Sequence, residues 1–448
     1  MFLPACRAAC WRLRKRNLMT DLRHHSFLPG FLRTSAADDE ALSVVRLSHA
    51  ARYMYGHPPS ADVIVLESAD ALAPYRKEID ALAATSTDTN TQFESVTLAA
   101  AMENLQGGSS VRVALLWSDA AGDGMRVLIG LVPYVAPRGY FGLPVPVIRV
   151  WEHIHSFIST PLLRMGYEQL AIRRFLSFAD RSGAALIQFP NFEADGAFAR
   201  ALRDVVELQH RVCRETDRHE RAFLQSDLGE EEYLATHMRK KKRKEFNRLW
   251  NRLAELGDLD FTTHDGGADV GGWVKAFLQL EASGWKGKRG TALKARPDER
   301  KYFEQICIGA AAEGKLHCTE ITLDGKPLAM LASFRAGAGV YTFKIAFDES
   351  YAKYSPGALL MMKLIGTFLR DERTAWVDSC AIPNHPMIDH IWAQRRPMRS
   401  VLVSSGNRFS KPLVSYVAAM MRIADLARAR LRVVYARIRK EIEHDQAH

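Results

Sequence analysis

The stretch from Gly337 to Arg370 constrains the fold of this 448-residue chain more than any other. Polar and apolar side chains alternate from Val340 to Phe347, and this period of two predicts a strand. A tyrosine-rich link then leads to Ser355-Pro356-Gly357. From Ala358 to about Arg370 the apolar residues have helical spacing. The stretch is therefore predicted to be a strand–turn–helix unit.

The turn of this unit is a candidate anion site. Ser355 suits the N-cap position, and Pro356 suits the first helical position, where its missing N–H costs nothing. Gly357 lets another group approach the backbone closely. Unpaired N–H groups and the positive end of the helix dipole favour a phosphate or pyrophosphate there. Most strand-to-helix turns bind nothing, so this interpretation is a hypothesis.

The order of predicted elements indicates two similar α/β domains, each with a mixed sheet flanked by helices. Three strands, a helix, a strand, a helix and a strand are predicted from Val111 to Leu224, and again from Leu316 to Val403. We expect one domain over residues 41–226 and a second over 227–405, in place of one large sheet. Residues 1–40 are predicted to be a disordered basic leader, and 406–448 an amphipathic helical tail.

The charge balance favours anionic partners. The chain has 61 Lys and Arg against 51 Asp and Glu, a net charge of +10. Six consecutive basic residues, 239–244, lie in a predicted long helix from Glu230 to Leu256. A solvated helix face and a phosphate-rich partner are both compatible with this run. A further short helix is predicted from Pro386 to Gln394.

The ends and the cysteines bear on location. Six scattered cysteines without a C-x-x-C pair indicate reduced thiols in the cytoplasm and no structural metal site. The basic leader lacks the apolar core of a secretory signal, although its composition also fits a mitochondrial-type presequence. No apolar run approaches the roughly 20 residues of a membrane span. The basic tail could pack on the second domain or on another copy, or lie on an anionic membrane surface, peripheral to the inner membrane.

Three groups of residues carry a family resemblance. They are Leu280–Gly287 with Gly290–Ala292, Lys344–Glu349 with Tyr354–Gly357, and Asp378–Cys380 with Asn384–Asp389 and Ile391-Trp392. In order and spacing they resemble the CelD-like acetyltransferases of the GNAT superfamily, which also look related to the FemABX aminoacyltransferases. The resemblance implies tandem GNAT-like folds and transfer of an acyl group from acyl-CoA to an amine or hydroxyl.

The resemblance also suggests a donor site. GNAT enzymes usually bind pyrophosphate with an Arg/Gln-x-x-Gly-x-Gly/Ala turn. The nearest register here is Lys353-x-x-Pro356-x-Ala358, with Lys for Arg and Pro for the central Gly. The expected cofactor-binding residues are Lys353, Tyr354, Ser355, Pro356, Gly357 and Ala358. The proline removes one N–H donor, and FemABX relatives diverge in the same segment.

Acyl transfer needs a base, donors for the oxyanion and a proton for the thiolate. The catalytic candidates are Glu281, Asp348, Asp378, Tyr341 and His385, and the substrate-binding candidates are Trp285, Lys286 and Asn384. Asp348 and Asp378 are predicted to face one cleft from two strand ends. Each candidate also has a structural explanation: a surface carboxylate, a turn cap or a packed ring. Cys380 is interpreted as a buried thiol.

Three functions remain open at this point. The first is an acyl-CoA-dependent N- or O-acyltransferase acting on a small polar or sugar-type acceptor, in polysaccharide or cell-envelope biosynthesis. The second is a FemABX-like aminoacyltransferase that uses charged tRNA. The third is a non-catalytic GNAT-fold scaffold that binds a partner or a membrane through its basic tail.

Overall fold

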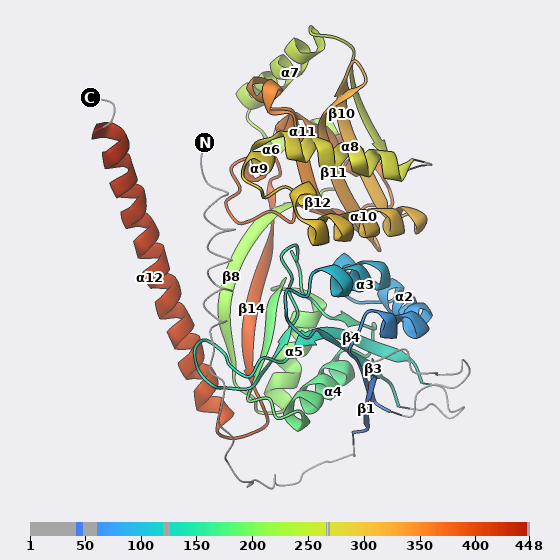
Figure 1. Cartoon of the computed structure of the whole chain (residues 1–448), viewed down its shortest axis with the longest axis vertical. Helices are drawn as coiled ribbons and strands as arrows, with labels where there is room; N and C mark the ends of the chain where they lie inside the picture. The colour runs from blue at the N-terminus through green and yellow to red at the C-terminus, as the bar shows by residue number, and fades with distance from the viewer. Residues whose placement is uncertain (1–41, 48–60, 120–125, 266, 268, 446–448) are drawn as a thin grey trace.

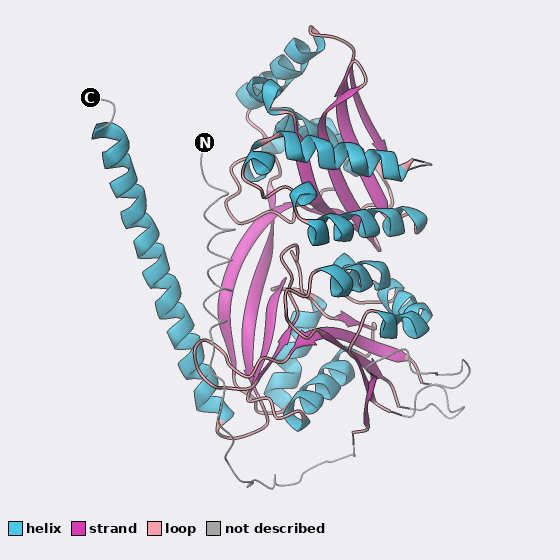
Figure 2. Ribbon diagram, in the orientation of Figure 1, coloured by secondary structure: helices cyan, strands magenta, loops and turns pink. Residues whose placement is uncertain are grey.

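The computed structural model describes residues 42–47, 61–119, 126–265, 267 and 269–445 (Figure 1). The predicted leader, residues 1–40, lies outside this range. Figure 2 shows a mixed α/β molecule, with helices packed against the faces of a long twisted sheet. A single helix, α12, stands beside the sheet and carries the C-terminus.

Within the described residues, the first half of the chain supplies eight strands and the helices between them. The strands are β1 (Val44–Leu47), β2 (Val63–Leu66), β3 (Arg112–Trp117), β4 (Leu128–Val135), β5 (Val147–Val150), β6 (Leu162–Leu163), β7 (Leu186–Glu193) and β8 (Cys213–Leu224). The helices are η1 (Asp70–Tyr75), α2 (Arg76–Ala84), η2 (Thr91–Phe93), α3 (Ser95–Asn104), α4 (Glu168–Arg181) and α5 (Ala197–Leu208). Every side chain of β4 is buried, as expected for a strand covered on both faces.

The second half repeats this alternation with longer helices. Its strands are β9 (Leu259–His264), β10 (Leu316–Leu323), β11 (Lys326–Ala336), β12 (Gly339–Phe347), β13 (Trp376–Asp378) and β14 (Gln394–Ser404). Its helices are α6 (Glu230–His237), α7 (Lys240–Ala254), α8 (Val270–Ser283), α9 (Trp285–Lys288), η3 (Leu293–Ala295), α10 (Pro297–Ala312), η4 (Glu349–Tyr354), α11 (Pro356–Arg370), η5 (Ile388–His390) and α12 (Ser410–Asp445).

The strands of both halves join one hydrogen-bonded sheet, whose order in the described chain is β1-β2-β3-β4-β5-β7-β14-β8-β13-β12-β11-β10-β9. From β2 or from β9 inward, the pairing is the same: three antiparallel pairs, one parallel pair and one antiparallel pair. This symmetry reflects two related halves. At the centre the halves exchange strands, because β14 pairs with β7 of the first half and β8 pairs with β13 of the second.

A buried ion cluster holds this exchange. Asp378, at the end of β13, is fully buried, and its Oδ2 accepts hydrogen bonds from Arg221 of β8 (2.5 Å) and Arg396 of β14 (2.8 Å). Arg396 also donates to Glu193 of β7. Four central strands are thereby connected through side chains as well as through their backbones. Such a cluster is costly to bury but far more costly to break.

Two layers of helices cover the sheet in the second half. Phe343 and Ala346 of β12 belong to the apolar core that includes α8 and α10, whereas Ile345 and Phe347 pack with α11. The first core continues into the first half, where α3 lies against α10. The two halves therefore share an apolar core as well as a sheet.

The strand–turn–helix prediction is confirmed by β12 and by α11, which begins at Pro356 and ends at Arg370. Three other expectations differ. One continuous sheet replaces two separate ones. The long basic helix is broken at Met238, whose extended backbone (ψ 128°) separates α6 from α7. The helix predicted over 386–394 is only the short η5, because β14 begins at Gln394.

The exchange makes a stability prediction. Asp378→Asn removes the charge that neutralises Arg221 and Arg396, and we expect it to lower the free energy of unfolding by about 3–5 kcal/mol. Urea denaturation followed by circular dichroism measures this. Glu245→Gln is the control, because Glu245 pairs with Arg248 on the surface, where the two side chains are 47% and 50% exposed. It should leave the urea midpoint almost unchanged, because exposed ion pairs contribute little to stability. Equal, small effects of the two changes would contradict the role of the cluster.

Candidate active site

The strand β12 separates from β13 after only three paired residues. Gly339, Val340 and Tyr341 pair with Trp376, Val377 and Asp378, and β12 then continues to Phe347 without this neighbour. The register between β11 and β12 shifts at the same place, so that Phe343 is an extra residue in a bulge. After Asp378 the chain turns away through Cys380, which has a positive φ of 48°. Among the described residues, no strand pairs with this side of β12 from 342 to 347, which we call the open part of β12.

The connection from β12 to α11 follows directly after this part of β12. Asp348 accepts hydrogen bonds from the backbone and side chain of Ser350 and so caps η4. Ser355 is in the left-handed region (φ 53°), and its side chain makes no capping hydrogen bond to α11. Pro356 lacks an N–H group, and Gly357 is buried next to Phe347. The start of α11 is thus accessible at Ser355 and closely packed at Gly357.

The sequence candidates on α8 and α9 lie beside this connection. Glu349, the first residue of η4, accepts a hydrogen bond from the backbone of Trp285 at 2.5 Å. Lys286 binds Glu281 at 2.9 Å and reaches the carbonyl oxygen of Ile345 in β12 at 3.4 Å. Three predicted residues, Glu281, Trp285 and Lys286, are thereby placed against the open part of β12.

A buried group of charged side chains lies next to Lys286. Glu281 is buried, and its second oxygen accepts the N–H of Leu293 at 2.8 Å. Lys344 projects from β12 beside the bulge, with Nζ 5.5 Å from the centre of the Phe343 ring. Burial and the nearby Lys286 lower the pKa of Lys344 to about 8. A lysine with such a pKa can exchange a proton near neutral pH.

The first half of the chain contributes to the same group through His155. Its Nε2 lies 3.1 Å from Glu299 of α10, and its ring stacks on Tyr302 at 5.7 Å. Burial lowers the pKa of His155 to about 4, so the imidazole is neutral at pH 7. Burial alone would raise the pKa of Glu299, but the hydrogen bonds from His155 and Arg296 lower it to about 2. The site therefore combines both halves.

The remaining sequence candidates lie elsewhere. Asp348 and Asp378 do not face one cleft: Asp378 pairs with Tyr341, seven residues before Asp348 in a parallel register. Burial raises and the two arginines lower the pKa of Asp378, with a net decrease that keeps it ionised. The hydroxyl of Tyr341 donates to the carbonyl oxygen of Thr89 at 2.6 Å, and the ring is fully buried. Asp378 and Tyr341 thus belong to the junction between the halves.

His385 and Asn384 lie in the loop after β13. Nδ1 of His385 accepts the N–H groups of Met387 and Ile388 at 3.3 and 3.4 Å, which is a capping arrangement. Asn384 has a positive φ of 57° and is exposed. Met387 of the same loop approaches Gly357, so the loop borders the start of α11 without placing His385 in the charged group.

Sequence reasoning missed Lys344, His155 and Glu299. A lysine in an otherwise apolar strand was a visible signal for Lys344, because burying an ammonium group is costly. The bulge at Phe343, which turns Lys344 toward α8, was not visible in the alternation. His155 and Glu299 are 144 positions apart in the sequence, and only the packing of the two halves brings them together.

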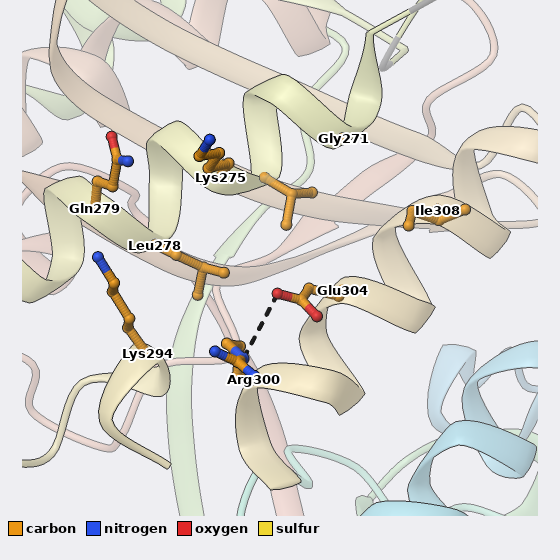
Figure 3. Close-up of a pocket in the computed structure, with 9 residues that line it drawn as sticks. Gly271, Lys275, Leu278, Gln279, Lys294, Arg300, Glu304 and Ile308 are labelled. Atoms are coloured by element: carbon orange, nitrogen blue, oxygen red, sulfur yellow. Dashed lines mark ion pairs between the residues drawn. The ribbon is translucent and has the colours of Figure 1, made fainter. Parts of the chain in front are cut away.

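Two basic surfaces border the site. Helix α7 packs against η4 and α11, and its exposed face carries Lys240, Lys241, Lys244 and Arg248. A groove of about 400 Å³ lies between α8 and α10 (Figure 3). Its lining includes Lys275, Lys294 and Arg300, over the apolar floor of Val274 and Leu278. Both surfaces suit anionic ligands. In the described residues, no group of side chains is arranged to hold a metal ion.

One family model matches part of the chain. Residues 240–382 match the family model described as "Acetyltransferase (GNAT) domain". This range contains Glu281, Lys286, Lys344 and the start of α11. Residues 240–382 therefore correspond to a GNAT acetyltransferase domain, which supports an acyltransferase, and the mixed α/β fold is of GNAT type. The match favours the enzyme over the non-catalytic scaffold. The match does not distinguish the CelD-like branch from other GNAT families, so membership of that branch stays a prediction.

No curated protein sequence matches the chain. Similar solved structures include FemX (13% identity, 77% of this chain and 98% of that one, TM-score 0.49). A tandem GNAT protein from the clavulanic acid biosynthesis pathway has 12% identity, covers 77% and 98%, and has a TM-score of 0.40. The C-terminal domain of a putative lysylphosphatidylglycerol synthetase from Agrobacterium fabrum has 12% identity, covers 78% and 96%, and has a TM-score of 0.44. At these identities, the donor and the acceptor of this chain remain to be proposed.

The environment of Lys344 predicts a pH-dependent stability. The folded pKa of about 8 lies below the ordinary 10.5, so the unfolded chain binds more protons between these values. The stability contribution of Lys344 therefore rises with pH across this window. We expect Lys344→Met to stabilise the protein at pH 7 by on the order of 2 kcal/mol, and this gain to shrink toward pH 10. Urea midpoints at both pH values measure it. A difference that does not change with pH would contradict the burial of this charge.

Proposed function

We propose that the protein is an acyl-CoA-dependent N- or O-acyltransferase whose donor enters between β12 and β13. The observation that carries the proposal is the separation of these strands after Tyr341. The start of α11 follows the far end of β12. In this proposal the thioester arm pairs with the open part of β12, and the donor phosphates lie near Ser355 and Lys353. Pro356 stands where GNAT enzymes usually have glycine, so one backbone N–H donor is missing. In this proposal the cations of α7 compensate for the missing donor.

The charged group beside β12 supports the chemistry of the proposed reaction. The acceptor's amine or hydroxyl attacks the thioester carbonyl, the C–S bond breaks, and the departing thiolate takes a proton. We assign proton removal from the acceptor to Lys344 in its neutral form, with Glu281 as the alternative. Both oxygens of Glu281 are already bonded, to Lys286 and to the N–H of Leu293, so it holds Lys286 in place. Main-chain N–H groups of β12 beyond Tyr341 are the candidate oxyanion donors.

The acceptor is proposed to be a small polar molecule, such as an amino sugar or a polysaccharide precursor. It would approach from the α8–α9 side, where Lys286 lies and where the guanidinium of Arg289 lies over the Trp285 ring, 5.4 Å from its centre. Cations and aromatic rings of this kind suit polar, hydroxyl-rich ligands. A role in polysaccharide or cell-envelope biosynthesis follows from this acceptor class and belongs to the proposal.

Calorimetry with acetyl-CoA tests the donor site. We expect Lys240→Glu combined with Lys244→Glu to weaken binding about tenfold at low salt, because two attractive charges become repulsive. Arg252→Glu, near the other end of α7, is the matched control and should have little effect. Gly357→Trp should abolish binding, since its side chain has to displace Phe347 and Ile345. Unchanged affinity in both the α7 double variant and Gly357→Trp would overturn the assignment.

A second candidate is a FemABX-like aminoacyltransferase, which the basic face of α7 also favours. Charged tRNA would give steeply salt-dependent binding, because each phosphate contact releases counterions. Under this alternative, we expect the wild type to bind tRNA in filter-binding assays at low salt and the α7 double variant to bind far less. A wild type that retains no tRNA at low salt removes this candidate and leaves the acyl-CoA proposal intact.

A further inference from the structure

In the part of α12 whose side chains are described, the contacts with the sheet lie in the first turns, up to Arg422, which donates to the carbonyl oxygen of Glu215 in β8 at 3.4 Å. The hydroxyl of Ser410 donates to the carbonyl oxygens of Ser405 and Asn407, which fixes the start of the helix. One face then packs against the ends of β5, β7 and β14, through an apolar cluster of Val414, Val417, Met421, Tyr140, Val147, Leu186 and Leu402. α12 contacts β8 and β14 at its base and diverges from β8 toward the C-terminus (Figure 1).

The other face of α12 is exposed and apolar. Among the described residues, fifteen large apolar side chains are exposed, and six of them lie between residues 409 and 431. They are Phe409, Tyr416, Met420, Ile423, Leu426 and Leu431, with exposed fractions from 38% to 65%. At 3.6 residues per turn, the five on the helix fall within an arc of about 140°. They form a stripe on the side of the helix away from the face that packs on the sheet, and Arg430 lies within its arc.

The charges around the stripe decide what can cover it. Residues 408–431 contain five cations (Arg408, Lys411, Arg422, Arg428 and Arg430) and one acid, Asp425. Asp425 is paired with Arg428 at 3.4 Å. Two copies of this helix facing one another would bring like charges together. An anionic surface instead attracts the cations while the stripe enters its apolar layer.

We propose that α12 docks this protein on an anionic lipid bilayer, lying in the plane of the headgroups with the stripe toward the acyl chains. Arg430 lies within the arc of the stripe and Arg422 beside it, so their side chains can reach the lipid phosphates while their stems remain in the apolar layer. Among the helices that the structure describes, none could span a bilayer. The enzyme would then meet its acceptor at the membrane surface.

Vesicle flotation with the purified full-length protein tests this proposal. The probes are vesicles of equimolar phosphatidylcholine and phosphatidylglycerol, compared with vesicles of phosphatidylcholine alone. We expect the wild type to float with the anionic vesicles and to remain with the soluble fraction otherwise. Ile423→Glu combined with Leu426→Glu should abolish flotation. Arg422→Gln combined with Arg430→Gln should lower the partition coefficient about tenfold or more, since each cation near the surface is worth about 1 kcal/mol.

Leu208→Glu is the matched control, because Leu208 is 62% exposed on α5, away from the stripe. It should float like the wild type. Unchanged thermal unfolding of all variants shows that the fold is intact, and unchanged acetyl-CoA binding separates docking from the donor site. Equal flotation of the wild type with both kinds of vesicle, or no flotation with either, overturns the proposal. If the wild type instead forms dimers in sedimentation and Ile423→Glu combined with Leu426→Glu loses them, the stripe is an interface with a second copy.

Discussion

The buried contact of Arg221 and Arg396 with Asp378 is the constraint on which the rest of the structure depends. It joins β8, β13 and β14 at the centre of the sheet, and through Glu193 it extends to β7. Strands far apart in the chain pair slowly, because the loop between them must be closed first. A charge cluster that is satisfied in one arrangement only disfavours other registers of the exchanged strands. Arg396 also lies over the ring of Trp376, which adds apolar contact to the charged one.

This constraint fixes where the candidate active site can form. Asp378 is the last residue of β13, so the cluster sets the point at which β12 loses its neighbour. The open part of β12 then faces α8 and α9, and the bulge at Phe343 turns Lys344 into the same space. His155 reaches this space from the first half and meets Glu299. Neither half alone contains the full set of charged groups.

The sequence predicted the local elements of the site well. The strand and helix around Ser355 and the proline at the first helical position follow from neighbouring residues. The roles of Glu281, Trp285 and Lys286 stay predictions. The long-range features were not predictable in this way. The exchange of β8 and β14 depends on pairing between distant strands, and no residue pattern marks it. The prediction that Asp348 and Asp378 face one cleft was wrong. It assumed that β12 and β13 end at the same level, and two apolar runs do not reveal that their pairing ends at Tyr341.

The central claim is that the acyl donor lies between β12 and β13. A crystal structure of the protein with bound acetyl-CoA tests this claim most directly. We expect the thioester beside the open part of β12, within reach of Lys344, and the phosphates between Ser355 and the cations of α7. A donor bound elsewhere, with the space beside β12 filled by side chains, would contradict the account.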